Sequence, residues 1–353
     1  MTKPTIWIFS LEPLDGRYTK QLHTNLPLIL SQAAGDQFKV RQIDGVQRTA
    51  TVTQGAFLNF SDTNYWKSSQ MCRFVELYDA GEVGDHDKIV YTDAWNPTIL
   101  QVKYMRDLLH RQWQIHALCW AGAHDPTDIL GYTMEKPWPL DAERSFFYAC
   151  DYTYFASHNH RSMFLRNLDI PQQYHGRALR NGFPNTPMVD QCAPYFDLPR
   201  SGSLMIWPHR YNDDKQPNIV EDLIKLGVNT VITQKLNLNK EEYYDELGRS
   251  SVIFSCSLHE NLGISMMEGC LAGAIPIVPD RCSYSEMYND VFKYPSEWTI
   301  DWDHYVRHRD QLLAFINERI VNREQYIPAL REQVKFLTEH YLTPRTLVEQ
   351  LMR

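Results

Sequence analysis

The chain has 353 residues, of which 43% are hydrophobic and 22% charged, and its formal net charge is −8 at pH 7. This length suffices for two ordinary domains, and the composition is typical of a soluble globular protein. The acidic balance argues against a strongly basic protein that binds DNA without sequence preference, and no apolar run approaches the roughly 20 residues of a membrane span.

In the first half of the chain, apolar runs alternate with helical patterns, which favours a parallel sheet with crossover helices. The expected strands, some with the loop that follows, lie at 5–13, 87–95, 114–125 and 151–158. The expected helices lie at 97–113 and 159–168.

Proline and glycine cluster at 190–202, and we place a domain boundary between residues 198 and 199. The alternation then starts again. The expected strands lie at 203–211, 229–236, 251–257 and 274–279, and the expected helices at 218–227, at 239–248 and in the stretch that ends at Gly273. From Trp298 onward the pattern is helical. The sequence therefore predicts an α/β protein with two doubly wound parallel-sheet domains.

Seven cysteines are scattered along the chain without a C-x-x-C pair. This pattern predicts reduced thiols in a cytoplasm and neither a disulfide framework nor a zinc site. The N-terminal stretch lacks the apolar core and the cleavage site of a signal peptide. We therefore expect a cytoplasmic protein without membrane attachment.

The most informative segment is 256–287, which follows a predicted strand and contains Glu260, Gly263 and Glu268. Strand, glycine-containing turn, helix and strand form a βαβ unit, whose turn lies at the carboxyl edge of the sheet, where doubly wound folds bind nucleotides. The amides that open the helix suit a diphosphate. Glu268 is placed to accept hydrogen bonds from ribose hydroxyls, and Glu260 to contact a sugar. Read without this context, both glutamates are surface carboxylates of an amphipathic helix.

Arg210 and Lys215 follow the first predicted strand of the second domain. Two cations beyond the carboxyl end of a strand can neutralise a diphosphate and stabilise it as a leaving group without a metal ion. The alternative is a solvated loop with an incidental pair of basic residues.

These motifs resemble those of retaining, nucleotide-sugar-dependent glycosyltransferases with the two-domain GT-B fold. Glu260 and Glu268 match the glutamate-x7-glutamate signature, small residues follow the second glutamate, and Arg210 and Lys215 match an arginine-x4-lysine motif. The stretch 204–286 resembles queuosine-tRNA mannosyltransferase-like enzymes in particular, through W-x-H-R-x-x-x-D-K-x-P and a later Y-x-E. Tyr211 stands where that branch usually has tryptophan.

The resemblance implies a GT-B architecture with two Rossmann-like domains facing a central cleft: an acceptor domain at 1–198, with a C-terminal helix at 336–353 packing back on it, and a donor domain at 199–335. It implies a nucleotide-sugar co-substrate, UDP- or GDP-linked, no permanently bound cofactor and no required metal. The residues expected to bind the donor are Arg210, Lys215, Glu260, Asn261, Leu262, Gly263, Ile264, Ser265 and Glu268.

The N-terminal segment 11–27 resembles glycosyltransferases of large bacteriophages, in which an E-P-x-x-x-R-Y-T pattern follows the first strand. Gly16 and Arg17 lie in that loop and are expected to contact the donor diphosphate or the acceptor. The alternative is a structural turn with Arg17 exposed.

Two further loops follow predicted strands and are expected at the same cleft. They carry Asp93 and His124, which we expect to orient the acceptor hydroxyl or to stabilise oxocarbenium-like charge. Aspartates in these loops, including Asp125 and Asp128, can instead cap the following helix. The tryptophans Trp95, Trp113 and Trp120 can stack on a base, but aromatic residues at strand ends are more often core residues.

The expected function is the retaining, metal-independent transfer of a hexose or pentose to a hydroxyl on a modified base in nucleic acid. The expected donor is UDP-glucose. The first acceptor is a 5-hydroxymethylpyrimidine such as hydroxymethylcytosine in bacteriophage DNA, flipped out of the stack, in the cytoplasm of a bacterial host. The alternatives are queuosine in tRNA, then a saccharide, lipid or small molecule. A non-catalytic nucleotide-binding module and a nucleotide-sugar epimerase are also kept open. The sequence predicts no oligomeric state.

Overall fold

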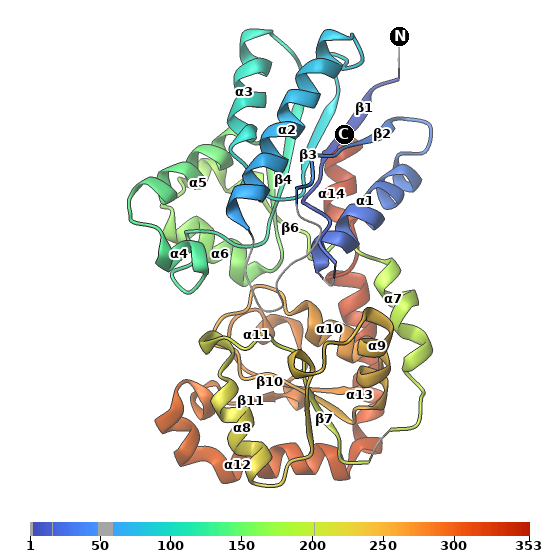
Figure 1. Ribbon diagram of the computed structural model, residues 1–353, viewed down its shortest axis with the longest axis vertical. Coiled ribbons are helices and arrows are strands. Elements are labelled where there is room, and N and C mark those ends of the chain that lie inside the picture. The colour runs from blue at the N-terminus through green and yellow to red at the C-terminus, as the bar shows by residue number, and fades with distance from the viewer. Residues whose placement is uncertain (1–2, 16, 49–58, 201) are drawn as a thin grey trace. The chain divides into compact units, whose positions relative to one another are not determined.

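The computed structural model describes residues 3–15, 17–48, 59–200 and 202–353. It consists of two compact units, one formed by Met1–Asn185 with Thr343–Arg353 and the other by Thr186–Leu342 (Figure 1). The second unit begins after residue 185 in the structure, whereas the sequence analysis placed the domain boundary after residue 198. The C-terminal segment Thr343–Arg353 belongs to the first unit. The helix Arg323–His340 ends before Pro344, and a separate helix, Arg345–Leu351, follows this proline.

The N-terminal unit contains a six-stranded parallel sheet in the order β2-β1-β3-β4-β5-β6. Its strands are β1 (Thr5–Phe9), β2 (Lys39–Ile43), β3 (Lys88–Tyr91), β4 (Gln114–Cys119), β5 (Tyr152–Phe155) and β6 (Ala178–Arg180). Its helices are α1 (Tyr18–Ala34), α2 (Phe60–Asp79), α3 (Thr98–Leu108), α4 (Ile129–Thr133), α5 (Trp138–Ala149), α6 (His158–Asn167) and α14 (Arg345–Leu351).

Both faces of this sheet are covered, as its apolar strands require. Trp7 and Phe9 of β1 belong to a core with Phe74 of α2 and Phe146 of α5. The alternate residues of the same strand belong to a second core, which includes side chains of α1 and α14. In Figure 1, α14 in red lies beside α1 in blue, and the two helices are in contact. The last helix of the chain therefore completes the core of the first unit.

The C-terminal unit contains a five-stranded parallel sheet in the order β11-β10-β9-β7-β8. Its strands are β7 (Met205–Trp207), β8 (Thr230–Ile232), β9 (Val252–Phe254), β10 (Ile275–Pro279) and β11 (Lys293–Tyr294). Its helices are α7 (Pro187–Cys192), α8 (Pro217–Lys225), α9 (Lys240–Arg249), α10 (Ile264–Leu271), α11 (Tyr284–Met287), α12 (Trp302–Val321) and α13 (Arg323–His340).

The expected strands and helices appear in the expected order, and the sequence analysis left several elements unnamed. It named no strand at 39–43, where the polar sequence KVRQI forms the edge strand β2 with mostly exposed or half-buried side chains. An edge strand has no buried run to reveal it. Within the described residues, no helix combines the length and the apolar character that crossing a bilayer demands.

Candidate functional site

The strand order of the C-terminal sheet changes direction at β7, which lies between β8 and β9. In open parallel sheets, ligands bind beyond the carboxyl ends of the strands at such a point. The loops that leave β7 and β9 here span 208–216 and 255–263. They carry the predicted donor residues from Arg210 to Gly263, so one edge of the sheet brings these residues together.

Hydrogen bonds tie the two loops to each other. The amide of Leu258 donates to the carbonyl of Asp214 over 2.8 Å, and Gln216 Nε2 donates to the carbonyl of Cys256 over 2.6 Å. The guanidinium of Arg281 also donates to the Cys256 carbonyl, over 2.7 Å. The Cys256 carbonyl lies outside the strands and helices, and the Asp214 carbonyl lies in a single 3₁₀ turn at Asp213–Lys215, so both need partners from elsewhere in the chain. The loops therefore form one braced frame rather than two independent turns.

Lys215 lies at the centre of this frame and is only 6% exposed. Its Nζ lies 3.2 Å from Asp214 Oδ2 and 3.4 Å from Glu260 Oε2, and it donates to the carbonyl of His259. A buried ammonium group needs such partners, because desolvation otherwise disfavours its charge. The structure thus pairs two of the residues that the sequence singled out.

The Glu260 carboxylate is bound at both of its oxygens. Oε1 accepts hydrogen bonds from the amides of Gly263 at 2.8 Å and Leu262 at 3.4 Å, while Oε2 faces Lys215. Burial alone would raise the pKa of Glu260. The charge of Lys215 and the Gly263 amide outweigh burial and lower the pKa to about 2. Glu260 is therefore ionised at neutral pH, and its side chain is 18% exposed.

This lowered pKa predicts a pH-dependent contribution to stability. A carboxyl group whose pKa falls from 4.5 to about 2 on folding stabilises the folded state above pH 4.5. The stabilisation is lost as the pH falls towards 2. At neutral pH it amounts to about 3 kcal/mol.

We expect Glu260→Gln to lower the free energy of unfolding at pH 7 and the difference from the parent protein to shrink as the pH falls below 4.5. Urea unfolding at a series of pH values measures it. Glu297→Gln, a change in a turn outside this frame, is the control. A difference that stays constant with pH would show that Lys215 does not stabilise the charge of Glu260.

The first turn of α10 has no side-chain cap. Gly263 occupies the N-cap position with a φ of 76°, whereas Asn239 caps α9 through a capping box. Within the described part of the chain, the amides of Ile264 and Ser265 donate to no acceptor. Both residues are half-buried, while the rest of the helix is buried. Amides at a helix N-terminus, together with the helix dipole, attract anions.

Glu268 lies further along α10 and is buried, with 4% exposure. Its Oε1 accepts hydrogen bonds from Lys240 at 2.5 Å and from Tyr244 at 3.2 Å, both on α9. A ribose hydroxyl that binds Glu268 has to share the carboxylate with these groups. The side chain of Lys240 is 43% exposed, so it can move aside without leaving a buried cavity.

Arg210 is exposed on the loop after β7, and its charge contributes to the environment of His209. The sequence analysis did not select His209. This residue is 5% exposed, and its Nε2 forms no hydrogen bond among the described residues. Burial, aided by the charge of Lys215, lowers the pKa of His209 to about 3. It is therefore a neutral imidazole beside Lys215 and Glu260, and the W-x-H-R pattern was the signal that pointed to it.

Other predicted donor residues occupy the turn before α10. Asn261 and Leu262 are buried there. In the first unit, Arg17 is half-buried at the start of α1, and its amide donates to the carbonyl of Leu14. Gly16 lies outside the described residues.

The structure places Asp93 and His124 in the loops after β3 and β4, where the sequence analysis expected loops. Asp93 Oδ2 lies 2.7 Å from Lys67 Nζ, and Asp93 Oδ1 accepts the amide of Trp95. His124 is 2% exposed, and both ring nitrogens contact buried side chains: Nδ1 lies 3.1 Å from Glu143 Oε2, and Nε2 lies 3.0 Å from His160 Nε2. In this arrangement neither nitrogen of His124 faces solvent, so its proposed contact with an acceptor stays a prediction.

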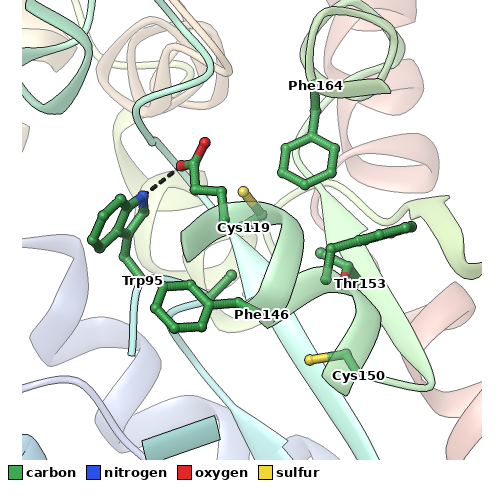
Figure 2. Close-up of a pocket in the computed structure, with 9 residues that line it drawn as sticks. Trp95, Cys119, Phe146, Cys150, Thr153 and Phe164 are labelled. Atoms are coloured by element: carbon green, nitrogen blue, oxygen red, sulfur yellow. Dashed lines mark hydrogen bonds between the residues drawn. The ribbon is translucent and has the colours of Figure 1, made fainter. Parts of the chain in front are cut away.

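The remaining residues of these loops stabilise the fold locally. Asp128 caps α4, as the alternative interpretation stated, and Asp125 accepts hydrogen bonds from Thr127. Trp113 is 1% exposed in the core. Figure 2 shows Trp95 beside Phe146, with its indole nitrogen directed at the carboxylate of Glu143. A tryptophan held in this way is a packing residue in the structure described.

The two parallel-sheet α/β domains have the GT-B fold of glycosyltransferases, which confirms the predicted fold class. No protein-family model matches the chain. The catalytic domain of starch synthase IV from Arabidopsis thaliana, bound to ADP and acarbose, is similar with a TM-score of 0.60 and 11% identity, over 100% of this chain and 98% of that one. Sucrose-phosphate synthase from Thermosynechococcus elongatus is similar with a TM-score of 0.59 and 12% identity, over 99% and 97%. At these identities the similarity establishes the fold alone.

The tRNA-queuosine alpha-mannosyltransferase of Drosophila melanogaster is similar in sequence, with 29% identity over 121 residues. The match covers 26% of this chain and 32% of that enzyme, so it spans about a third of the length of this relative.

Proposed function

We propose that this protein is a glycosyltransferase whose C-terminal unit binds a nucleotide-sugar donor. The observation that carries the proposal is the arrangement beyond β7 and β9, where Lys215, Glu260 and the uncapped first turn of α10 meet at the strand-order reversal. A diphosphate suits the helix amides and the cations, while the carboxylate accepts hydrogen bonds from sugar hydroxyls. Similarity to structures of sugar-transferring enzymes, one of them bound to ADP, supports the same reading.

In this proposal Arg210 and Lys215 bind the diphosphate and stabilise the negative charge that develops on it as the glycosidic bond breaks. The Lys215 ammonium group has three N–H donors, and one of them donates a hydrogen bond to the His259 carbonyl. The remaining contacts, to Asp214 at 3.2 Å and Glu260 at 3.4 Å, are long enough for a phosphate oxygen to replace one of them. Because these residues supply the charge, the proposed step requires no metal ion.

The proposed transfer retains the configuration of the sugar. The acceptor hydroxyl attacks on the face from which the diphosphate leaves, and the departing phosphate takes the hydroxyl proton. Glu260 holds the transferred sugar, and Glu268 holds the ribose of the donor. Glu260 is suited to this role because it is ionised, partly exposed and fixed by the amides of the α10 turn.

For the acceptor, we propose a hydroxyl on a modified base in nucleic acid, presented by the N-terminal unit. The first candidate is a 5-hydroxymethylpyrimidine in DNA, which has to leave the base stack to react. The second is queuosine in tRNA, which the partial similarity to the Drosophila enzyme favours.

The test is to incubate the purified protein with UDP- and GDP-linked sugars and with three acceptors, followed by mass spectrometry of the digested nucleosides. The acceptors are DNA with hydroxymethylcytosine, DNA with hydroxymethyluracil, and queuosine-containing tRNA. We expect a hexose or pentose adduct on one nucleoside with one donor. The same nucleic acids without the modified base serve as controls.

The other outcomes separate the parts of the proposal. Release of nucleotide from a donor without any adduct would keep the donor site and exclude these three acceptors. A free sugar or an epimer as the product would indicate hydrolysis or epimerisation instead of transfer. No turnover and no binding of any donor would contradict the proposed function.

A further inference from the structure

Four buried side chains cluster at the carboxyl ends of β4 and β5 in the N-terminal unit. Cys119 ends β4, His124 lies in the loop after it, and His160 lies in the first turn of α6. Glu143 reaches the cluster from α5. These side chains belong to residues that are at most 4% exposed. The proposed transfer does not require such a cluster, so its chemistry calls for a separate explanation.

The positions of three of these side chains suit a metal ion. One ligand atom each of Cys119, His124 and His160 lies within 4.8 Å of the other two, and the Nε2 atoms of the two histidines are 3.0 Å apart. A tetrahedral zinc ion, with Zn–N of about 2.0 Å and Zn–S of about 2.3 Å, holds its ligand atoms roughly 3.3–3.6 Å apart. The two imidazoles have to separate by a few tenths of an ångström, and the thiol has to approach them by at most about 1.3 Å.

Glu143 prepares His124 for this role. Its carboxylate lies 3.1 Å from His124 Nδ1. The carboxylate also accepts hydrogen bonds from the backbone amides of Ala123 and His124, with N···O distances of 2.8 Å each. The carboxylate that accepts these two amides also suits an N–H donor at His124 Nδ1, and the lone pair on Nε2 then faces His160. A carboxylate behind a histidine is the usual second-layer partner of a zinc ligand.

Gly122 makes the close approach of this carboxylate possible. A Cβ atom at position 122 would lie 1.8 Å from Glu143 Oε1. Any other residue there would displace the carboxylate and with it the ring of His124. The backbone is therefore shaped around the Glu143–His124 pair.

Zinc binding changes where two protons lie. Because the thiolate is the form of cysteine that binds metals, binding of Zn²⁺ releases the thiol proton of Cys119. The proton that His160 carries on Nε2 moves to its Nδ1, so that Nε2 can bind the ion.

The cluster borders a small cavity at Cys119 and Glu143. Cys119 and Glu143 line a cavity of about 10 Å³ together with Cys150 and Phe164 (Figure 2). This volume is near the smallest that holds one water molecule. We propose that Cys119, His124 and His160 bind one zinc ion and that Glu143 orients His124 for this role. All three ligands are buried and belong to the N-terminal unit, whereas the proposed donor residues belong to the C-terminal unit.

The experiment uses the full-length protein without an affinity tag, purified without chelators. We expect about one zinc ion per chain by plasma mass spectrometry. After removal of the metal, titration with Co²⁺ should give the charge-transfer band of a single thiolate–cobalt bond, and added Zn²⁺ should abolish this band. Zinc should also raise the melting temperature, because it binds the folded state.

Single substitutions test which residues bind the metal ion. Cys119→Ala should lose the charge-transfer band, and His160→Gln should weaken zinc binding at least tenfold in a chelator competition. The matched control is Cys150→Ala, which removes another buried thiol from the same cavity but not from the cluster, and it should bind zinc like the parent.

The parent protein alone can overturn the proposal, whether or not the variants fold. The proposal is wrong if the metal-free parent gives no thiolate–cobalt band and no rise in melting temperature with zinc. It is also wrong if folded Cys119→Ala, checked by circular dichroism, binds both metals like the parent. In either case the cluster is a hydrogen-bonded core network.

Discussion

Replacing Lys215 by methionine is expected to lower the rate of sugar transfer by about 10²–10³-fold, the usual effect of removing one charged donor that stabilises a developing anion. Methionine keeps the length of the side chain and fills the same buried volume, but it has no charge to place on the diphosphate. Because that charge grows as the bond breaks, turnover should fall more than donor affinity. Steady-state kinetics with the donor identified by the panel, and calorimetric titration with its nucleotide, measure the two effects.

The substitution also leaves Glu260 without its closest cation, so stability has to be measured in parallel. Lys215→Met should lower the free energy of unfolding, and adding Glu260→Gln should restore part of it, because a buried charge without a partner is then removed. The double variant should stay inactive. Lys235→Met removes an exposed lysine of a nearby loop and should keep full activity. Unchanged kinetics in folded Lys215→Met would exclude Lys215 from the donor site.

Replacing Gly263 by alanine is expected to weaken donor binding strongly and to lower the free energy of unfolding by about 2–5 kcal/mol. The φ of 76° at this position costs a residue with a side chain about 1–2 kcal/mol. In addition, the new Cβ would lie 2.8 Å from Cε1 of Tyr284, a ring that is completely buried, and such overpacking costs about 1–3 kcal/mol. Relief of this clash would shift the first turn of α10, whose amides we propose to bind the phosphates.

The matched control separates backbone strain from the clash. Gly227 has a φ of 95°, and a Cβ there meets no atom within 4 Å, so Gly227→Ala carries the strain alone and should bind the donor normally. Urea unfolding and calorimetric titration with the donor nucleotide compare the two variants. Equal destabilisation in both, with donor affinity unchanged in Gly263→Ala, would show that the α10 turn does not contact the donor.

Much of the C-terminal unit could be predicted from its sequence. The helix after Gly263 and the strands on either side of it produce strong local patterns, and the structure has them at 264–271, 252–254 and 275–279. The pairing of Lys215 with Glu260 joins residues 45 positions apart. Periodicity cannot reveal such a pair, and only the resemblance to GT-B enzymes suggested that these residues share a site.

The N-terminal unit could be predicted less well. His124 lies in a loop after a strand, as expected, but its partners come from α5 and α6 and enclose it. The sequence analysis expected no zinc site, because the cysteines form no close pair. The cluster that we propose to bind zinc joins a single cysteine to two histidines whose spacing along the chain matches no metal-binding motif.

The sequence by itself determined the order of the strands and helices that it revealed, the α/β class of the fold and the segment that carries the donor motifs. These features depend on apolar periodicity and turn residues within short windows. Only the tertiary structure decided which side chains are buried together. Glu143 lies 19 residues from His124, and His160 lies 36 residues from it. Such contacts depend on how separate helices pack against the sheet, and the free energy of that packing is shared among many residues and is not encoded in any one stretch of the chain.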